Sequence, residues 1–431
     1  MKIAIAGTGY VGLVTGVCLA EVGHTNVVCV DVDDKKVDLM KVGVSPIHED
    51  NLEALMIKNY QLGRIDYTTD YKSAYKDADV IMIAVGTPER SDGSANLDYI
   101  KQVAKQISQT ITKDTLIVIK STVPIGTNDK IESYIRKNLK NNVKVELASN
   151  PEFLSQGTAV ADTLQASRIV VGVESEWAKD ILDEIYQPFN QPIVVTNRNS
   201  AEMIKYASND FLALKISFMN DIANLCEIVG ANIEDVAKGM SYDDRIGSKF
   251  LKAGIGYGGS CFPKDTKALH WLSSHNGYEL KTVKAAIEVN ESQKLRLVRK
   301  ASKLVESFEG MKVAVLGLTF KPDTDDLREA PSIPNIKYLI ERGANVVAYD
   351  PVGVKNTKKI FGNSIEYASS IDEAISDSEI CFIMTEWSEI VNYDISNYKS
   401  KMKNPLLLDG RNCYKVEDMS NIGVDYYSIG R

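Results

Sequence analysis

Residues 2–12 of the chain, Lys-Ile-Ala-Ile-Ala-Gly-Thr-Gly-Tyr-Val-Gly, decide the fold of its N-terminal part. A short apolar run leads into three glycines in a Gly-x-Gly-x-x-Gly pattern: Gly7, Gly9 and Gly12. A helix-like segment comes next at 13–21, and a second apolar run at 27–30 ends at Asp31. A strand, a glycine turn, a helix, a strand and an acid in this order are the fingerprint of a dinucleotide-binding unit.

Each part of this fingerprint has a physical role. Gly7 permits the tight turn, Gly9 lets the backbone approach a pyrophosphate, and Gly12 lets the helix pack closely on the sheet. The N-terminus of that helix offers unpaired N–H groups to the phosphates. Asp31 would accept hydrogen bonds from the ribose hydroxyls and repel a 2′-phosphate, which predicts NAD rather than NADP as the cofactor. The alternative is a purely structural glycine turn.

Further strands extend the same sheet. Three short runs with many β-branched residues are each followed by a Gly or a Pro: 79–85, 116–119 and 143–148. Short runs of this kind, rich in β-branched residues, predict strands. Ligands of a doubly wound sheet bind beyond the carboxyl ends of its strands. We therefore expect Thr87, Thr122 and Glu152 to lie around one crevice, although they are far apart in sequence.

The C-terminal third of the sequence repeats the pattern of the first third. Three segments echo earlier ones: 311–315 echoes 1–5, 346–350 echoes 27–31, and 377–389 echoes 77–89. The second copy lacks the glycine triplet, because 317–322 reads Gly-Leu-Thr-Phe-Lys-Pro. We predict that this copy does not bind a dinucleotide in the same way, and that its loop grips an anion instead through Lys321 and the nearby Arg328.

A long segment between the two copies, 200–229, contains neither Pro nor Gly. A helix over this segment is ~45 Å long at 1.5 Å per residue, which is longer than one domain needs. Its apolar residues cover more than half of the circumference, so we expect it to join two domains and to form a dimer interface. The predicted fold is α/β, with two Rossmann-like doubly wound domains joined by a long central helix. The predicted boundaries are 1–198, 199–300 and 301–431.

The composition narrows the class of protein. The chain has 431 residues, 44% hydrophobic and 25% charged, as in a globular protein of two or three domains. A net charge of −8 argues against nucleic-acid binding through bulk positive charge. Six scattered cysteines and four histidines form no metal-binding motif. With no signal peptide and no apolar run near the ~20 residues of a membrane helix, we expect a cytoplasmic protein without membrane contact.

The segment 254–265, Gly-Ile-Gly-Tyr-Gly-Gly-Ser-Cys-Phe-Pro-Lys-Asp, is the most unusual in the sequence. Its cluster of glycines predicts a loop that wraps a ligand with bare backbone N–H groups. Cys261 follows the glycines of this loop, and the positive charge of the nearby Lys264 would favour its nucleophilic thiolate form. The alternative is a buried structural cysteine. On the long helix, Lys205 and Asn209 are four residues apart and share one face. Helical spacing alone favours a solvated position for this Lys.

These motifs make the sequence similar to the UDP-glucose/GDP-mannose dehydrogenase family, and most similar to its UDP-glucose branch. The resemblance runs nearly from end to end of the chain and rests on seven ordered motifs. They are Gly-Thr-Gly-Tyr-Val-Gly at 7–12, Val-Gly-Thr-Pro at 85–88, Ser-Thr-Val-Pro at 121–124, Asn-Pro-Glu-Phe-Leu at 150–154, Lys205 with Asn209, the block that ends in Cys-Phe-Pro-Lys-Asp at 250–265, and the block that begins Gly-Leu-Thr-Phe-Lys-Pro-Asp at 317–332.

The resemblance implies a two-step oxidation of UDP-glucose by NAD, from alcohol to aldehyde and from aldehyde to acid. Cys261 matches the family's nucleophile, which forms a thiohemiacetal and then a thioester. Lys205 and Asn209 match the pair that stabilises the developing oxyanion. Asp265 is then placed to activate water or to steer protons. The resemblance also implies that 1–198 binds NAD, that 199–300 forms a dimer, and that 301–431 binds the UDP-sugar.

The resemblance further implies binding residues. Thr122 and Glu152 match a group that handles water and protons. The residues implied for NAD are Gly7, Gly9, Tyr10, Val11, Gly12, Asp31, Lys36, Thr87, Thr122, Glu152, Lys264 and Arg328. Those implied for the nucleotide sugar are Glu152, Phe153, Leu154, Ser155, Lys205, Asn209, Phe250, Leu251, Lys252, Ala253, Gly254, Gly258 and Lys321. Arg245 matches a residue that reaches the partner subunit's substrate, so a homodimer is implied.

Two alternatives stay open at this point. The first is the same chemistry on another nucleotide sugar, such as GDP-mannose or a UDP-N-acetylhexosamine. The second is an NAD-binding redox sensor, in which Cys261 is switched by oxidation and no steady turnover occurs. Release of NADH from a mixture of NAD and UDP-glucose would distinguish an enzyme from a sensor.

Overall fold

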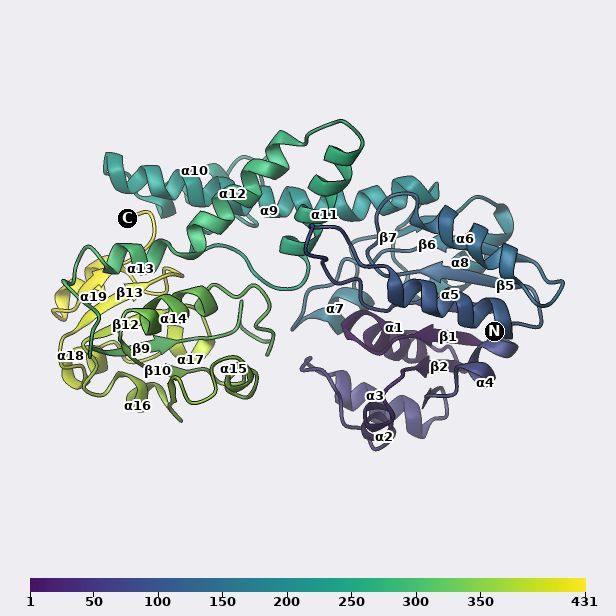
Figure 1. Cartoon of the computed structure of the whole chain (residues 1–431), viewed down its shortest axis with the longest axis horizontal. Helices are drawn as coiled ribbons and strands as arrows, with labels where there is room; N and C mark the ends of the chain where they lie inside the picture. Colours follow the sequence, from purple (N-terminus) through teal and green to yellow (C-terminus); the bar gives the residue numbers. More distant parts are fainter. The chain divides into compact units, whose positions relative to one another are not determined.

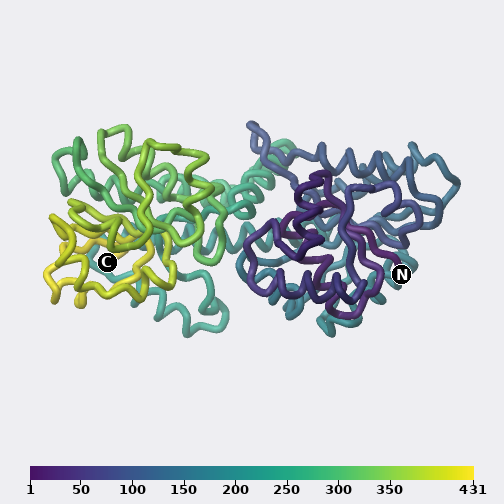
Figure 2. The backbone as a smooth tube through the Cα atoms, turned by 90° about the horizontal axis from the view of Figure 1, so that it is seen from below, coloured from purple at the N-terminus to yellow at the C-terminus, as the bar shows by residue number.

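The computed structural model describes residues 1–431, which form two compact units, Met1–Ser208 and Asn209–Arg431 (Figure 1). The N-terminus belongs to the first and the C-terminus to the second, and we call them the N-terminal and the C-terminal unit (Figure 2). None of the helices is both long and apolar enough to cross a membrane.

An eight-stranded sheet forms the centre of the N-terminal unit, in the order β3-β2-β1-β4-β5-β6-β7-β8. Its strands are β1 (Ile3–Ala6), β2 (Val27–Val30), β3 (Ile65–Thr68), β4 (Val80–Ile83), β5 (Thr115–Ile119), β6 (Val145–Ser149), β7 (Ile169–Gly172) and β8 (Ile193–Thr196). Neighbouring strands are parallel, except that β6 and β7 meet antiparallel at Ser149 and Gly172. The first six strands have the order of a dinucleotide-binding doubly wound sheet, which confirms the predicted fold class.

Helices of the N-terminal unit pack on both faces of this sheet. They are α1 (Tyr10–Glu21), α2 (Asp34–Lys41), α3 (Leu52–Gln61), α4 (Tyr71–Lys76), α5 (Asp98–Thr110), α6 (Thr127–Asn138), α7 (Ala159–Leu164), α8 (Glu176–Tyr186) and the 3-10 helix Gln187–Phe189. Along β1, Ile3 and Ile5 join the core that includes α1 and α8, whereas Ala4 and Ala6 join the core that includes α5 and α6. Because both faces are buried, the strands read as continuous apolar runs.

The long helix α9 (Arg198–Val229) has 32 residues, which confirms the helix predicted over 200–229. It begins in the N-terminal unit and continues into the C-terminal unit. At 1.5 Å per residue its length is ~48 Å. Six of its large apolar side chains are exposed: Met203, Phe211, Phe218, Leu225, Ile228 and Val229.

A six-stranded parallel sheet forms the centre of the C-terminal unit, in the order β11-β10-β9-β12-β13-β14. Its strands are β9 (Lys312–Leu316), β10 (Asn345–Tyr349), β11 (Glu366–Tyr367), β12 (Ile380–Ile383), β13 (Leu406–Asp409) and β14 (Asp425–Tyr427). Its helices after α9 are α10 (Ile233–Ser241), α11 (Phe262–His275), α12 (Lys281–Lys294), α13 (Arg296–Ala301), α14 (Ser332–Glu341), α15 (Val354–Phe361), α16 (Ile371–Ile375), α17 (Ser388–Val391), α18 (Ser396–Lys401) and α19 (Val416–Asn421).

The second sheet repeats the first, as the sequence repeat predicts. Gly317, after β9, has a φ of +87°, close to the +98° of Gly7 after β1. Asp350 after β10 accepts hydrogen bonds from two backbone N–H groups of the turn that follows Gly317. Asp350 is only 3% exposed, and the indole N–H of Trp387 also donates to it. A ribose therefore cannot reach this carboxylate, which agrees with the prediction that the second copy does not bind a dinucleotide in the same way.

Candidate active site

The predicted site residues are divided between the two units. Those in the N-terminal unit are Gly7, Gly9, Tyr10, Val11, Gly12, Asp31, Lys36, Thr87, Thr122, Glu152, Phe153, Leu154, Ser155 and Lys205. Those in the C-terminal unit are Asn209, Arg245, Phe250, Leu251, Lys252, Ala253, Gly254, Gly258, Cys261, Lys264, Asp265, Lys321 and Arg328.

The glycine turn after β1 has the geometry that a pyrophosphate requires. A methyl group on Gly12 would lie 2.0 Å from the carbonyl oxygen of Gly7, so only glycine fits there. A Cβ atom at Gly9 would meet nothing within 4 Å, so the backbone is open to a ligand at this point. α1 begins at Tyr10 without a side-chain cap, and its first N–H groups have no partner within the helix. The turn therefore fits the pyrophosphate of NAD.

Asp31 lies just after β2, beside this turn. Its Oδ2 atom accepts the backbone N–H of Thr8 at 3.2 Å and lies 3.4 Å from Nζ of Lys36. Burial would raise the pKa of Asp31, but the hydrogen bond from the Thr8 hydroxyl and the charge of Lys36 outweigh it and lower the pKa below its usual value. The carboxylate is therefore charged at neutral pH and can bind ribose hydroxyls.

The carboxyl ends of β4, β5 and β6 come together, as predicted. These strands are neighbours in the sheet. The hydroxyl of Thr87 donates to the carbonyl oxygen of Thr122 at 2.9 Å. Glu152 follows β6 by three residues. Parallel strands thus gather at one edge three polar residues that are separated by up to 65 positions in the sequence.

Glu152 and Lys205 form a buried ion pair, with 3.1 Å between Oε1 and Nζ and side chains only 9% and 2% exposed. The other carboxylate oxygen accepts the backbone N–H of Leu154 at 2.8 Å. The ring of Phe153 contacts two cations, with its centre 3.7 Å from the guanidinium carbon of Arg168 and 5.4 Å from Nζ of Lys205. The solvated position considered for Lys205 is therefore wrong, and Arg168 joins the site without having been predicted.

Lys120, at the end of β5, is a second buried lysine that the sequence reasoning missed. Its Nζ atom donates to the side-chain oxygen of Asn150 at 2.8 Å and to the hydroxyl of Tyr186 at 3.3 Å. Burial lowers the pKa of Lys120 to about 8, although the charge of Glu152 opposes the shift. The signal available in the sequence is that this lysine directly follows the apolar residues 116–119, which predict a buried strand.

In the C-terminal unit, Cys261 is the residue that precedes α11. The residue is partly exposed and forms no disulfide, and its sulfur lies 3.8 Å from the hydroxyl oxygen of Ser260. The N-terminus of a helix carries a partial positive charge, which favours a thiolate over a thiol. The residue is therefore not fully buried, in contrast to the alternative of a buried structural cysteine.

The first turn of α11 holds a buried carboxylate that is tied to α9. Asp265 is 1% exposed and accepts a hydrogen bond from the amide of Asn209 at 2.7 Å. Lys264 forms an ion pair with the same carboxylate. The same lysine is the one that the sequence predicts to favour the thiolate of Cys261, three residues earlier. The start of α11 carries a partial positive charge next to this cysteine as well.

The glycine loop before Cys261 differs from the expectation of bare N–H groups. The backbone N–H groups of Gly254, Ile255, Tyr257 and Gly259 all donate to protein oxygens, at 2.8 to 3.0 Å. A Cβ atom at Gly258 would lie 2.4 Å from the backbone oxygen of Glu329. The glycines therefore serve close packing within the C-terminal unit. Of the adjoining predicted residues, Leu251, Ala253 and Gly254 are buried, whereas Phe250 and Lys252 are exposed.

Three predicted cations of the C-terminal unit lie outside the core. Arg245 pairs with Asp243 at 2.6 Å, and its side chain is 90% exposed. Arg328 pairs with Asp326 at 2.6 Å and is 60% exposed. Nζ of Lys321 lies 5.7 Å from the ring centre of the preceding phenylalanine. Both guanidinium groups are thus exposed to solvent, and each is paired with the aspartate two residues before it.

Three family models match consecutive parts of the chain. They describe the NAD binding domain, the central domain and the UDP binding domain of the UDP-glucose/GDP-mannose dehydrogenase family, over residues 1–190, 199–292 and 314–416. The chain belongs to this family. The glycine turn beside Asp31 lies in the part that matches the NAD binding domain, and Cys261 lies in the central part.

Members of the family align with the whole chain. It is 49% identical over 431 residues to a UDP-glucose 6-dehydrogenase of Bacillus subtilis, and the alignment covers 100% of this chain and 98% of the relative. It is 45% identical over 438 residues to a UDP-glucose 6-dehydrogenase of Rhizobium meliloti, which covers 100% of both. The solved structure of a UDP-glucose dehydrogenase from the archaeon Pyrobaculum islandicum has a TM-score of 0.92 at 34% identity, over 99% of this chain and 96% of that one.

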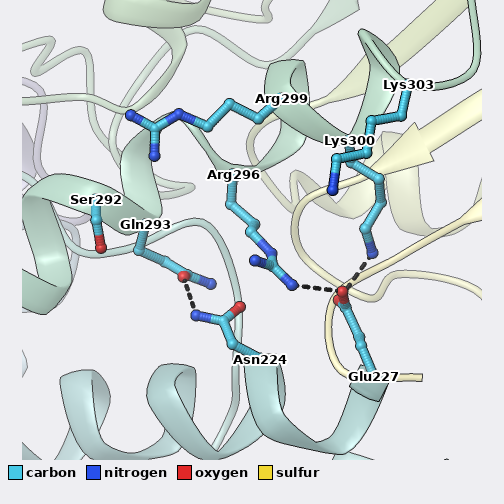
Figure 3. A pocket seen from close by; sticks show the side chains of 8 residues that line it. All are labelled: Asn224, Glu227, Ser292, Gln293, Arg296, Arg299, Lys300 and Lys303. Carbon is cyan, nitrogen blue, oxygen red and sulfur yellow. Dashed lines mark hydrogen bonds and ion pairs between the residues drawn. The ribbon is translucent and has the colours of Figure 1, made fainter.

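A basic pocket of about 250 Å³ lies elsewhere in the C-terminal unit (Figure 3). It is lined by Asn224, Glu227, Ser292, Gln293, Arg296, Arg299, Lys300 and Lys303, none of which belongs to the predicted site. Glu227 forms ion pairs with Arg296 at 2.7 Å and Lys300 at 2.8 Å, and it accepts the backbone N–H of Gly430 at 2.9 Å. Through Glu227, these contacts connect α9 with α13 and with the backbone at Gly430.

Proposed function

We propose that this family member is a UDP-glucose 6-dehydrogenase, which oxidises UDP-glucose to UDP-glucuronate in two NAD-dependent steps. The observation that carries the proposal is the place of Cys261, a thiol at the start of α11, four residues before the Asp265 that binds Asn209. A hydride acceptor alone leads only to an aldehyde, whereas a thiol offers a route to the acid. Identity of 49% with the Bacillus subtilis enzyme supports UDP-glucose as the substrate.

The N-terminal unit is proposed to hold NAD through the residues implied by its fold. The glycine turn and the start of α1 bind the pyrophosphate, and Asp31 binds ribose hydroxyls. Thr87, at the carboxyl end of β4, adds a polar contact at the same edge of the sheet. When bound, NAD supplies the acceptor for the hydride that leaves the sugar. Lys264 and Arg328 of the C-terminal unit are proposed to contact the cofactor as well.

The sugar oxygen is proposed to be stabilised from α9. Lys205 and Asn209 are one helical turn apart on this helix and donate to the oxygen as negative charge develops on it. Glu152 fixes the ammonium of Lys205 by their buried ion pair. Thr122 holds a water molecule that accepts the proton of the sugar hydroxyl. UDP is proposed to bind through Lys321 and the residues before the glycine loop.

The second oxidation is proposed to pass through a thioester. The sulfur of Cys261 adds to the aldehyde carbon, whose oxygen takes up a proton, and a thiohemiacetal forms. This adduct loses a hydride from carbon and a proton from oxygen, which leaves a thioester. Asp265 directs water to the thioester carbon, and cleavage of the C–S bond releases the carboxylate and restores the thiol. The balance is two hydrides per sugar, with one oxygen atom supplied by water.

The proposed enzyme is a homodimer. Phe211, Phe218 and Leu225 of α9 are seven residues apart, so they form one stripe, and each is more than half exposed. An apolar stripe of this length is a liability on the surface of a monomer. Arg245 is exposed and is proposed to reach the partner's substrate. Sedimentation at micromolar concentration tests this, and a monomeric mass would refute it.

The experiment that tests the proposed activity is a substrate panel with NAD. We expect UDP-glucose to release two NADH per sugar consumed, with UDP-glucuronate as the product. Turnover of GDP-mannose or of a UDP-N-acetylhexosamine in preference to UDP-glucose would refute the substrate, and no turnover with any nucleotide sugar would favour a redox sensor. We also propose the three-part division at 198 and 300. The cytoplasm is proposed as the site of action, because all six cysteines are free.

A further inference from the structure

A second carboxyl group is buried next to Asn209. Asp210 is the following residue of α9, is only 4% exposed, and neither of its carboxylate oxygens has a hydrogen-bond partner. Buried polar atoms nearly always have such partners, because a lone charge is costly to remove from water. Asp265 shows the usual arrangement, since it is equally buried but is bound by Asn209 and Lys264.

Three groups act electrostatically on Asp210 or respond to it. Asp265 and Lys264 are on α11, and Tyr257 is in the loop before that helix. Burial and the like charge of Asp265 raise the pKa of Asp210 to about 8, against a smaller opposite effect of Lys264. Burial, with a contribution from Asp210, raises the pKa of Tyr257 to about 12, so this phenol stays neutral. At neutral pH, Asp210 therefore carries a proton, while Asp265 is paired with Lys264.

We propose that Asp210 is a positioning residue that must be neutral for the enzyme to work, because its ionisation disturbs the Asn209–Asp265 pair and opposes the oxyanion. This inference rests on the proposed function and concerns the same site. In the neutral state of Asp210, Lys264 and the amide of Asn209 both bind the carboxylate of Asp265.

Loss of the Asp210 proton changes this balance for a physical reason. It places a second negative charge near Asp265 in a region without solvent, where charges interact far more strongly than in water. The new charge competes for Lys264 and for the Asn209 amide. It also repels the negative charge that develops on the sugar oxygen beside Asn209. Activity is thus lost as pH rises through the pKa of Asp210.

Asp210→Asn tests the proposal, since an amide has the size of the neutral acid and cannot ionise. We expect kcat of the variant to equal that of the wild type at pH 7 and to exceed it about tenfold one unit above the pKa of Asp210, at saturating NAD and UDP-glucose. Asp394→Asn removes an exposed carboxylate of the same unit and should leave the pH profile unchanged. Identical profiles for wild type and Asp210→Asn, or a folded variant that is inactive at pH 7, would overturn the proposal.

Infrared spectroscopy of the wild type keeps the proposal falsifiable if the variant does not fold. A buried protonated carboxyl should give a C=O band that disappears with a midpoint near pH 8, and the absence of such a titration would overturn the proposal. A wild type that oxidises no nucleotide sugar at any pH would refute the proposed function. The infrared titration would then still decide whether Asp210 holds a proton.

Discussion

The Glu152–Lys205 ion pair permits a quantitative prediction about stability. Lys205→Met keeps most of the side-chain volume but leaves the carboxylate of Glu152 buried without its partner. Removal of one member of a buried ion pair typically costs about 3–5 kcal/mol. A domain of this size loses ~2–4 °C in Tm per kcal/mol, so we expect the Tm of the N-terminal unit to fall by roughly 6–20 °C.

Differential scanning calorimetry of the full chain measures this change, and two further variants sharpen it. Lys179→Met breaks the half-exposed pair with Asp183 on α8 and should cost less than ~1 kcal/mol, because water screens that pair. Lys205→Met combined with Glu152→Gln removes both buried charges and should recover most of the lost stability. A double variant no more stable than Lys205→Met, or a Lys205→Met protein as stable as Lys179→Met, would refute the reasoning.

Three further predictions concern single residues. Asp31 should lower kcat/KM with NADP about 10³-fold relative to NAD. Its carboxylate and the 2′-phosphate are like charges, and two such charges near 4 Å cost ~4 kcal/mol at an effective dielectric of 20. Comparable kcat/KM values with the two cofactors would contradict this. Burial lowers the pKa of Lys120 to about 8, so the unfolded chain binds this proton more tightly and the folded state gains stability as pH rises from 8 towards 10.5. Between pH 7.5 and 9.5, the unfolding free energy of the wild type should therefore rise by about 2 kcal/mol relative to Lys120→Met in urea titrations, and a constant difference would count against the shift. Gly258→Ala should lower the free energy of unfolding by about 1–3 kcal/mol, because the added methyl group would lie 2.4 Å from the backbone oxygen of Glu329. Gly239→Ala is the control: its methyl group meets open space, so this variant should be as stable as the wild type or more stable. Equal thermal stability of the two variants would disprove the close packing at Gly258.

The sequence predicted best those features that follow from local pattern. The strand, glycine turn and acid at residues 2–31 fix the first βαβ unit, because each residue acts through its own backbone or its near neighbours. Parallel pairing then determines that Thr87 and Thr122 meet, since the ends of adjacent strands share one edge. The repeat likewise follows from segments of similar sequence, and α9 from a long segment without Pro or Gly. By contrast, β7 and β8 were not predicted, and the antiparallel junction at β6 follows from no local signal.

The contacts that the sequence did not predict depend on which groups the fold places next to each polar group. Lys264 lies three residues from Cys261 in sequence, yet it pairs with Asp265, whose buried charge needs compensation. The glycine loop has the composition of a ligand cradle, but four of its N–H groups donate to protein oxygens, among them the side-chain oxygens of Asn220 and Asn290. Burial of Lys120 and of Asp210 depends on tertiary packing, which spacing along the chain does not reveal.

The most direct test of the thioester mechanism is the count of NADH and the intact mass of Cys261→Ser. The substitution is small and lies at a helix start, so folding and NAD binding should persist. Acid formation should fall by roughly 10²-fold or more, as expected when a covalent step is removed, with a sugar adduct accumulating on the new hydroxyl. Cys413→Ser is the matched control, because burial raises the pKa of Cys413 far above its usual range and this thiol should be inert.

The wild type and the Cys413 control should both release two NADH for each UDP-glucose, whereas Cys261→Ser should release only traces of NADH. A Cys261→Ser protein that still forms two NADH per sugar at nearly the wild-type rate, without any adduct in its mass spectrum, would contradict the role of this cysteine as the nucleophile.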